Sequence, residues 1–139
     1  MPNAFVDTNI LVYAADESTP LERKTRIARE LLRQRNLQVS VQVLNEFTVN
    51  ARSKSKLNLS PQQEQEWLAR WLLFPVWPLT VDTFLAAKLI HARFQVSHWD
   101  SLILAAARET GSAIVYSEDL NPGQDYDGVK VINPFLEGA

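Results

Sequence analysis

Apolar residues along the chain follow two patterns, short clusters and longer stretches in which they recur every three or four positions. The short clusters predict five strands, at residues 4–6, 37–41, 76–79, 113–116 and 129–132. Pro78 places the third of these at a sheet edge, because proline cannot donate to a central ladder. Strands that alternate with helices are typical of a mostly parallel sheet covered on both faces, so we expect an α/β fold.

Helical spacing fills the segments between the predicted strands. Residues 21–35 have an apolar face and an opposite face that carries Arg26, Arg29 and Arg33. Further helices are predicted after Asp7, around 44–49, from Ser60, over 81–94, and from Ser97 to a stop at Gly111.

The helix that begins at Ser60 carries a large apolar stripe. Its members are Trp67, Leu68, Trp71 and Leu72. Aromatic residues at this spacing belong either to the core or to a dimer interface. The sequence leaves both interpretations open.

Length and composition limit the class of protein. The 139 residues are 46% hydrophobic and contain no Gly/Ser-rich or Pro-rich stretch, so we expect a single domain over residues 1–139. The absence of cysteine excludes disulfides, thiolate catalysis and cysteine-type zinc sites. No apolar segment approaches the ~20 residues that span a bilayer, and the N-terminus does not resemble a signal peptide. We expect a cytoplasmic protein without membrane contact.

The cations are unevenly distributed, although the net charge is only -2. Nine of the 14 lie in one part of the chain, namely Arg23, Lys24, Arg26, Arg29, Arg33, Arg35, Arg52, Lys54 and Lys56. One flank of the protein is therefore suited to phosphates while the rest is comparatively acidic. A solvated helix face is the alternative for the arginines at 26, 29 and 33.

Four acidic residues occupy the ends of predicted elements. Asp7 and Asp119 follow two strands, and Glu46 and Asp100 lie at or near the start of two helices. Two unit charges ~4 Å apart repel by roughly 4 kcal/mol at an effective dielectric near 20. Four clustered carboxylates therefore stay ionised only around a cation, and the pattern predicts a hydrolytic Mg²⁺ or Mn²⁺ site.

Two of these acids also fit helix capping. Asp7 is a good N-cap for the helix that follows it. Asp100 lies three residues after Ser97, which is the spacing of a capping box, and the helix dipole stabilises a carboxylate there without metal.

The other two acids have alternatives of a different kind. Glu46 lies in an apolar segment, where a buried carboxylate needs a partner or a surface position. Asp119 belongs to a loop in which Glu118, Asp125 and Asp127 are rivals for the same role.

Four segments that contain these acids, taken in order, resemble the PIN domain in the form found in VapC-like toxins. They are residues 5–14, 45–47, 100–107 and 117–120, with the acids 39, 54 and 19 residues apart, and residues 126–135 resemble the end of the family. The likeness extends from about residue 3 to residue 135. It implies a three-layer fold with a five-stranded parallel sheet in the order 3-2-1-4-5.

The resemblance also assigns roles within the site. Asp7, Glu46 and Asp100 match the family's three principal metal-site acids, and Asp119 matches a more variable fourth. Thr8, Asn9 and Ser117 match polar positions that line the site. Glu118 departs from the pattern, which leaves open whether it or Asp119 points inward.

The resemblance implies metal-dependent hydrolysis of RNA phosphodiester bonds. This chemistry requires no histidine base, because a metal ion activates water. His91 and His98, the two histidines, are expected to have structural roles. RNA binding is expected to draw on Arg52, Lys54 and Lys56 and on the arginine face at 26, 29 and 33.

The toxin resemblance implies three further properties. They are a small cognate antitoxin, a homodimer, and a structured RNA target such as tRNA or rRNA whose cleavage blocks translation.

Other classes fit the sequence less well. A haloacid-dehalogenase-like phosphatase needs a second Asp where this chain has Asn9, and a receiver domain needs a second early acid and a late lysine. All four glycines lie at or beyond residue 111, which excludes an N-terminal phosphate-binding loop. A catalytically degenerate PIN-like module that binds RNA or protein is the remaining alternative.

Overall fold

The computed structural model describes residues 2–19 and 22–136, and its core is a six-stranded sheet. The strands are β1 (Ala4–Val6), β2 (Leu37–Ser40), β3 (Val76–Trp77), β4 (Ile114–Tyr116), β5 (Asp125–Tyr126) and β6 (Val129–Ile132). Their order is β3-β2-β1-β4-β6-β5, and every neighbouring pair is parallel except β5 and β6. The predicted α/β class with a mostly parallel sheet is confirmed.

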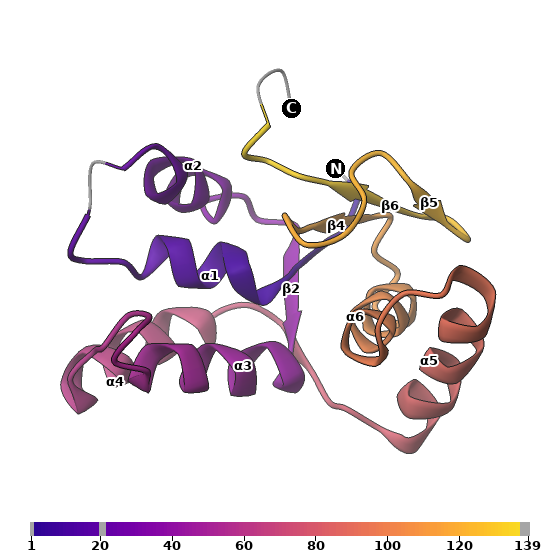
Figure 1. Ribbon diagram of the computed structural model, residues 1–139, viewed down its shortest axis with the longest axis horizontal. Coiled ribbons are helices and arrows are strands. Elements are labelled where there is room, and N and C mark those ends of the chain that lie inside the picture. Colours follow the sequence, from indigo (N-terminus) through magenta and orange to yellow (C-terminus); the bar gives the residue numbers. More distant parts are fainter. Residues whose placement is uncertain (1, 20–21, 137–139) are drawn as a thin grey trace.

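Six helices flank this sheet. They are α1 (Thr8–Ala14), α2 (Arg23–Leu31), α3 (Val41–Arg52), α4 (Pro61–Trp71), α5 (Val81–Phe94) and α6 (His98–Glu109). In Figure 1 the helices α1 to α4 gather on one side of the strands, and α5 and α6 lie on the other. None of the described helices is both long and apolar enough to cross a membrane.

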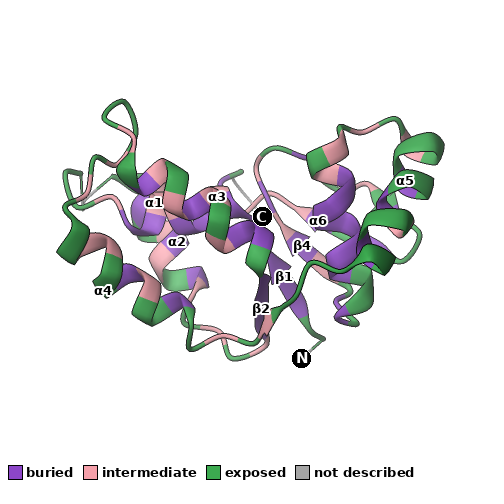
Figure 2. Ribbon diagram, turned by 90° about the horizontal axis from the view of Figure 1, so that it is seen from below, coloured by how far each residue is buried: buried purple, intermediate pink, exposed green. Residues whose placement is uncertain are grey.

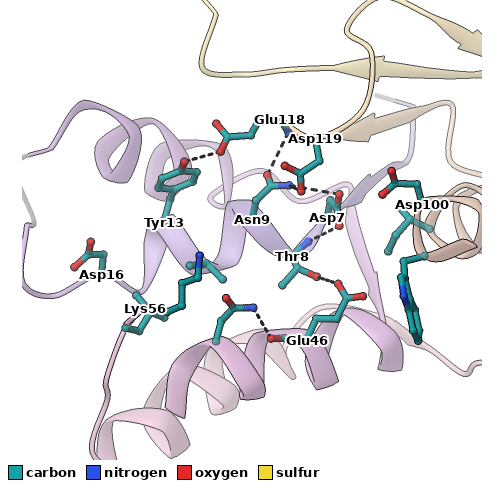
Figure 3. Close-up of a pocket in the computed structure, with 15 residues that line it drawn as sticks. Asp7, Thr8, Asn9, Tyr13, Asp16, Glu46, Lys56, Asp100, Glu118 and Asp119 are labelled. Atoms are coloured by element: carbon teal, nitrogen blue, oxygen red, sulfur yellow. Dashed lines mark hydrogen bonds between the residues drawn. The ribbon is translucent and has the colours of Figure 1, made fainter. Parts of the chain in front are cut away.

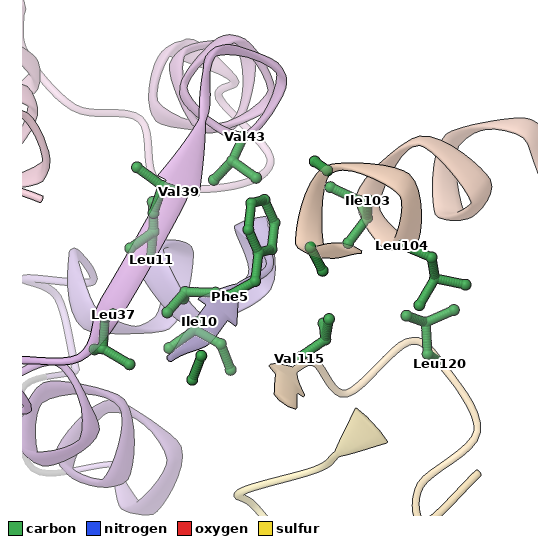
Figure 4. Packing of buried hydrophobic residues seen from close by; sticks show 14 of the residues in the cluster. Phe5, Ile10, Leu11, Leu37, Val39, Val43, Ile103, Leu104, Val115 and Leu120 are labelled. Atoms are coloured by element: carbon green, nitrogen blue, oxygen red, sulfur yellow. The ribbon is translucent and has the colours of Figure 1, made fainter. Parts of the chain in front are cut away.

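The central strands are buried because helices cover both faces of the sheet. All three residues of β1 and all four of β2 are buried, so the polar positions in β2 are enclosed as well (Figure 2). Figure 4 shows Phe5 lying between residues of β2 and α3 on one side and Ile103 of α6 on the other. This packing places the N-terminal halves of α3 and α6 on either side of β1 (Figure 4).

Local signals set most of the helix boundaries. Ser60 and Gln63 form the predicted capping box before α4, and Ser97 caps α6. The α4 stripe is divided, since Trp67 and Trp71 are buried and stack at 5.4 Å, whereas Leu72 is 60% exposed. The two tryptophans therefore belong to the core and do not form a dimer face.

Two predicted elements differ from the observed ones. The helix predicted over 21–35 ends at Leu31, because tight turns at Arg33 and Gln34 lead the chain into β2; residue 21 lies outside the described residues. The short strand β5 was not predicted. Asp127 and Gly128 both have positive φ values, 55° and 95°, and form the two-residue turn that pairs β5 with β6. The sheet accordingly has six strands where five were expected.

Candidate functional site

The site is built where strand order reverses, at the carboxyl ends of β1 and β4. These neighbours pair in register, Val6 with Tyr116, so the residues that follow them emerge side by side. Asp7 is one of them, and Ser117 is the other. The Ser117 hydroxyl donates to Asp7 Oδ2 at 2.7 Å, and the backbone N–H of Thr8 donates to Asp7 Oδ1 at 2.7 Å. Both oxygens of this buried carboxylate are thereby oriented.

Glu46 is contributed by α3, about a turn and a half from its start. The Thr8 hydroxyl donates to Glu46 Oε2 at 2.7 Å, and Gln42 Nε2 donates to Oε1 at 3.1 Å. Each oxygen of the Glu46 carboxylate therefore has a hydrogen-bond donor, which compensates for placing an acid in an apolar segment. Figure 3 shows Glu46 reaching from its helix toward Thr8 and Asp7.

Asp100 lies in the first turn of α6. Its backbone N–H donates to the Ser97 hydroxyl at 3.0 Å, so the Ser97 side chain caps the helix. Burial raises the pKa of the Asp100 carboxyl, and the charges of Asp119 and Glu46 raise it further, against the opposing effect of Ser97. The acid therefore interacts electrostatically with other members of the group as well as occupying a capping position.

Asn9 connects Asp119 to the other residues of the site by hydrogen bonds. Asn9 Nδ2 donates to Asp119 Oδ2 at 3.1 Å and lies within 3.4 Å of both Asp7 Oδ2 and the Ser117 hydroxyl. The backbone N–H of Asp119 donates to Ser117 Oγ at 3.1 Å. One amide thus links the carboxylates that follow β1 and β4.

Glu118 has different partners. Its Oε1 accepts from the Tyr13 hydroxyl at 2.5 Å, and its Oε2 forms an ion pair with Lys24 Nζ at 2.7 Å. Figure 3 shows the Glu118 side chain directed toward Tyr13, with Asp119 nearer Asp7.

The two further rivals of Asp119 are also engaged elsewhere. Asp125 accepts from the Gly128 N–H in the hairpin turn. Asp127 pairs with Arg93 at 2.9 Å.

All four acids line one cavity of about 610 Å³. Its wall also includes Tyr13, Asp16, Asn50, Lys56, Trp99 and Glu118. Among the described residues that line it, Lys56 alone is basic. The cavity is therefore strongly acidic, with one cation at its margin.

The pKa of the Asp7 carboxyl is raised far above its usual value. Burial raises its pKa from 3.8 to about 7, and the charges of Asp119 and Glu46 add to the effect, although the bonds from Ser117 and Thr8 oppose it. Within residues 2–19 and 22–136, none of the four carboxylates forms an ion pair with a basic side chain. Hydrogen-bond donors orient these carboxylates, but no basic side chain of the described residues neutralises their charge.

This donor set fits a hard divalent cation. Carboxylate oxygens are the ligands that Mg²⁺ and Mn²⁺ prefer, and Mg²⁺ keeps several waters while binding only one or two carboxylates directly. In the part of the chain that the structure describes, no three acidic or histidine side chains converge as a ready-made coordination shell. The spacing of the four acids therefore suits an ion that keeps part of its water shell better than an ion ligated by protein oxygens alone.

The cations expected to bind RNA are dispersed. Lys56 lines the cavity, whereas Arg52 forms an ion pair with Glu64 at 2.7 Å. Arg29 turns back to donate to the backbone carbonyls of Ala14 and Asp16.

The remaining cations of the predicted RNA-binding set are exposed. These are Lys54, Arg26 and Arg33. Arg29 is occupied by backbone contacts, and Arg33 lies beyond the end of α2 and pairs with Glu30 at 3.4 Å. The three arginines at 26, 29 and 33 therefore do not form one free face.

Several site residues were missed by sequence reasoning. Gln42 is 4% exposed, and its Nε2 donates both to Glu46 and to the Trp99 carbonyl at 3.3 Å, which joins α3 to the start of α6. Its position one helical turn before Glu46 was the available signal. Lys24 and Tyr13 have no local signal, because their role depends on packing between α1, α2 and the β4 loop.

The histidines lie away from the four acids. His91 Nδ1 contacts the Val96 carbonyl at 2.6 Å, and the His98 ring packs against Phe84 and Trp99. Neither histidine lines the acidic cavity.

Comparison with solved structures shows the same fold in toxin proteins. A toxin-antitoxin complex from Klebsiella pneumoniae is 22% identical with a TM-score of 0.71, over 95% of this chain and 98% of that one. VapC20 from Mycobacterium tuberculosis, a sarcin-ricin loop cleaving toxin, is 19% identical with a TM-score of 0.67, over 84% and 90%. DNA-bound VapBC from Salmonella typhimurium is 18% identical with a TM-score of 0.67, over 94% and 97%.

Comparison by sequence identifies the family itself. No curated protein matches the chain in sequence. The PIN domain family matches residues 4–124, which span β1 to the loop before β5 and include all four acids. Since this match covers most of the sequence and agrees with the fold, the chain belongs to the PIN domain family.

Proposed function

We propose that this chain is a metal-dependent endoribonuclease and the toxin of a toxin-antitoxin pair, acting as a single domain in the cytoplasm. The observation that carries the proposal is the group of four carboxylates that share one cavity and form no ion pair with a basic side chain among the described residues. Such a group is costly for stability unless it binds a cation. The site lies outside the carboxyl ends of the strands, at the reversal of strand order, where open α/β sheets bind ligands.

In this proposal Asp7, Asp100 and Asp119 would hold Mg²⁺ or Mn²⁺, one or two of them directly and the rest through bound water, and Glu46 would contribute directly or through water. When bound there, the ion would lower the pKa of a water molecule and stabilise negative charge on the phosphate. Ser117 and Thr8 orient carboxylates by donating to Asp7 and Glu46.

Asn9 has a separate role in the proposed site. It keeps the Asp119 side chain close to Asp7 through its amide. These hydrogen bonds prepare the donor oxygens before the ion arrives.

The substrate is proposed to be a structured RNA such as tRNA or rRNA, cleaved so that translation stops. VapC20, which has a similar fold, is a toxin that cleaves the sarcin-ricin loop, and this supports RNA as the substrate class. A phosphate contact by Lys56 is supported by its position in the wall of the acidic cavity. Exposed Lys54, Arg26 and Arg33, and Arg52 once released from Glu64, extend the positive surface.

The proposed partners are a cognate antitoxin and a second copy of this chain. The Klebsiella and Salmonella structures of similar fold are toxin-antitoxin assemblies, which supports the antitoxin. The homodimer is supported by exposed apolar side chains on α5, where Leu85 is 55% and Leu89 75% exposed.

The test is to induce wild-type protein and Asp7→Asn in cells and to map cleaved RNA ends, then to repeat cleavage with purified protein and Mg²⁺. Asn keeps an oxygen for the Thr8 N–H and a polar group for Ser117, so the fold is expected to survive while the charge is lost. We expect growth arrest and defined RNA ends with wild type only. Full cleavage by a folded Asp7→Asn variant contradicts the proposal.

A further inference from the structure

Trp99 lines the acidic cavity, and neither core packing nor metal binding explains its position there. Its side chain is 62% exposed, unlike Trp67 and Trp71, which are buried in the core. It lines the same cavity as the four acids and directly precedes Asp100 in the chain. A large indole left in solvent beside a charged site adds nothing to core packing, which points to a ligand.

The position of Trp99 is held from two sides. Its carbonyl accepts a hydrogen bond from the buried Gln42 side chain, which also contacts Glu46. Its ring meets the His98 ring edge-on at 5.2 Å, and His98 in turn meets Phe84 at 6.1 Å. The indole is therefore presented at a defined place relative to the carboxylates of α3 and α6.

The cavity offers three kinds of contact. It has acids for a cation that binds phosphate, one lysine at position 56, and one exposed aromatic surface. A nucleotide carries the matching groups, because its phosphate is anionic and its base has a flat apolar face. Base stacking on an aromatic side chain tolerates any sequence, since every base has a π-face.

We propose that Trp99 is a stacking platform for one unpaired nucleobase next to the cleaved phosphodiester. The proposal rests on the proposed function and narrows its substrate class. A base in a duplex is already stacked on both sides, so the platform selects loops, bulges or single strands. Lys56 then contacts a phosphate of the same strand elsewhere along the cavity.

A protein partner is the competing occupant of this surface. Exposed apolar residues continue from Phe84 along α5, so an apolar side chain of another chain is able to cover Trp99. Such a partner needs no base and no unpaired nucleotide. Removing a base from the RNA therefore weakens binding if Trp99 stacks on a nucleobase, and has no effect at Trp99 if a protein covers it.

The experiment measures binding of short single-stranded RNA to the full chain, with Ca²⁺ replacing Mg²⁺ to hold cleavage back. We compare wild type with Trp99→Ala, Trp99→Phe and the control Trp77→Ala, which alters a 39% exposed tryptophan outside the cavity. We expect Trp99→Ala to weaken binding about tenfold or more, Trp99→Phe to retain most of it, and Trp77→Ala to have no effect.

A second arm moves one abasic nucleotide along the RNA. One position is expected to weaken binding by wild type and to have no further effect on Trp99→Ala, because the same stacking contact is lost in both. Equal affinity of wild type and Trp99→Ala, or absence of such a position, overturns the proposal even when wild type cleaves RNA. So does a Trp99→Ala variant that loses only self-association or antitoxin binding.

Failure of the proposed function has a separate signature. If wild type cleaves no RNA in Mg²⁺ but the Trp99-dependent abasic position is still found, the chain binds unpaired nucleotides without cleaving them. The stacking platform is then supported and the ribonuclease is not.

Discussion

The hydroxyl of Ser117 donates to Asp7 across 110 positions of sequence, at 2.7 Å. This bond exists because β1 and β4 are parallel neighbours whose last residues, Val6 and Tyr116, are paired. The same hydroxyl accepts from the backbone of Asp119. A single serine thus ties together the two strand ends that carry acids of the candidate site.

Removing this serine hydroxyl tests the relationship. In Ser117→Ala the pKa of Asp7 is expected to rise above about 7, because the Ser117 bond lowers it in the native protein. The acidic limb of the pH–rate profile is expected to move to higher pH by about one unit, with about tenfold lower cleavage at neutral pH, since a bond to a charged group contributes about 1.5–3 kcal/mol. Ser112→Ala, which changes a buried serine outside the cavity, is the control. An unchanged profile in Ser117→Ala contradicts this account.

The stability of the metal-free protein is expected to fall as pH rises from about 4 through 7. The folded pKa of Asp7, about 7, exceeds its unfolded value near 3.8, so the folded state binds more protons in this window. The contribution is fully present below the unfolded pKa and is lost as pH passes the folded one. Chemical denaturation at several pH values measures it, and Asp7→Asn is expected to flatten the slope and to be more stable at pH 8 by about 1–3 kcal/mol.

Mg²⁺ is expected to reverse that pH effect. An ion that binds only the folded state stabilises it, and the gain grows with the ratio of ion concentration to Kd. The melting temperature of wild type at pH 8 is therefore expected to rise with Mg²⁺ or Mn²⁺, and that of Asp7→Asn much less. EDTA should restore the starting value. Equal shifts in both proteins would show that the ion binds elsewhere.

Gln42 is expected to position Glu46 and the start of α6. Gln42→Leu removes both donated bonds and should lower kcat by tenfold or more and weaken Mg²⁺ binding, with a small effect on KM. Gln38 provides a matched control, because it is also buried but contacts Thr110 and Trp77 outside the cavity. Both leucine variants should lose similar stability, and only the Gln42 variant should lose metal affinity. An equal loss of metal affinity in both variants would show that Gln42 acts only through packing.

The neighbouring acids Glu118 and Asp119 are expected to be unequal. Asp119→Asn should lower cleavage by at least tenfold, whereas Glu118→Gln should keep most activity, because the Glu118 carboxylate is paired with Lys24 and Tyr13. Lys24→Met frees Glu118 and should alter metal affinity, and combining it with Glu118→Gln should restore the native value. The Mg²⁺ affinities of the four variants test which acid binds the metal. A larger loss of affinity in Glu118→Gln than in Asp119→Asn would assign the metal-binding role to Glu118 instead.

Much of the architecture was predictable because its signals are local. Ser60 and Ser97 mark helix starts, α5 begins and ends at the predicted residues, and apolar clusters locate five of the six strands. The strand at Asp125–Tyr126 was missed although Asp127-Gly128 is a hairpin signal. Such a short strand has too little apolar pattern of its own to be recognised.

The sequence by itself determined which residue types are available at the element ends, and therefore that acids gather at one edge of the sheet. Only the tertiary structure decided which way each side chain turns. Glu118 and Asp119 are adjacent and chemically alike, yet contacts with Lys24 and Asn9, from α2 and α1, direct them to different partners. The physical reason is that capping and hydrophobic periodicity act over a few residues, whereas side-chain direction depends on partners that folding brings from distant positions.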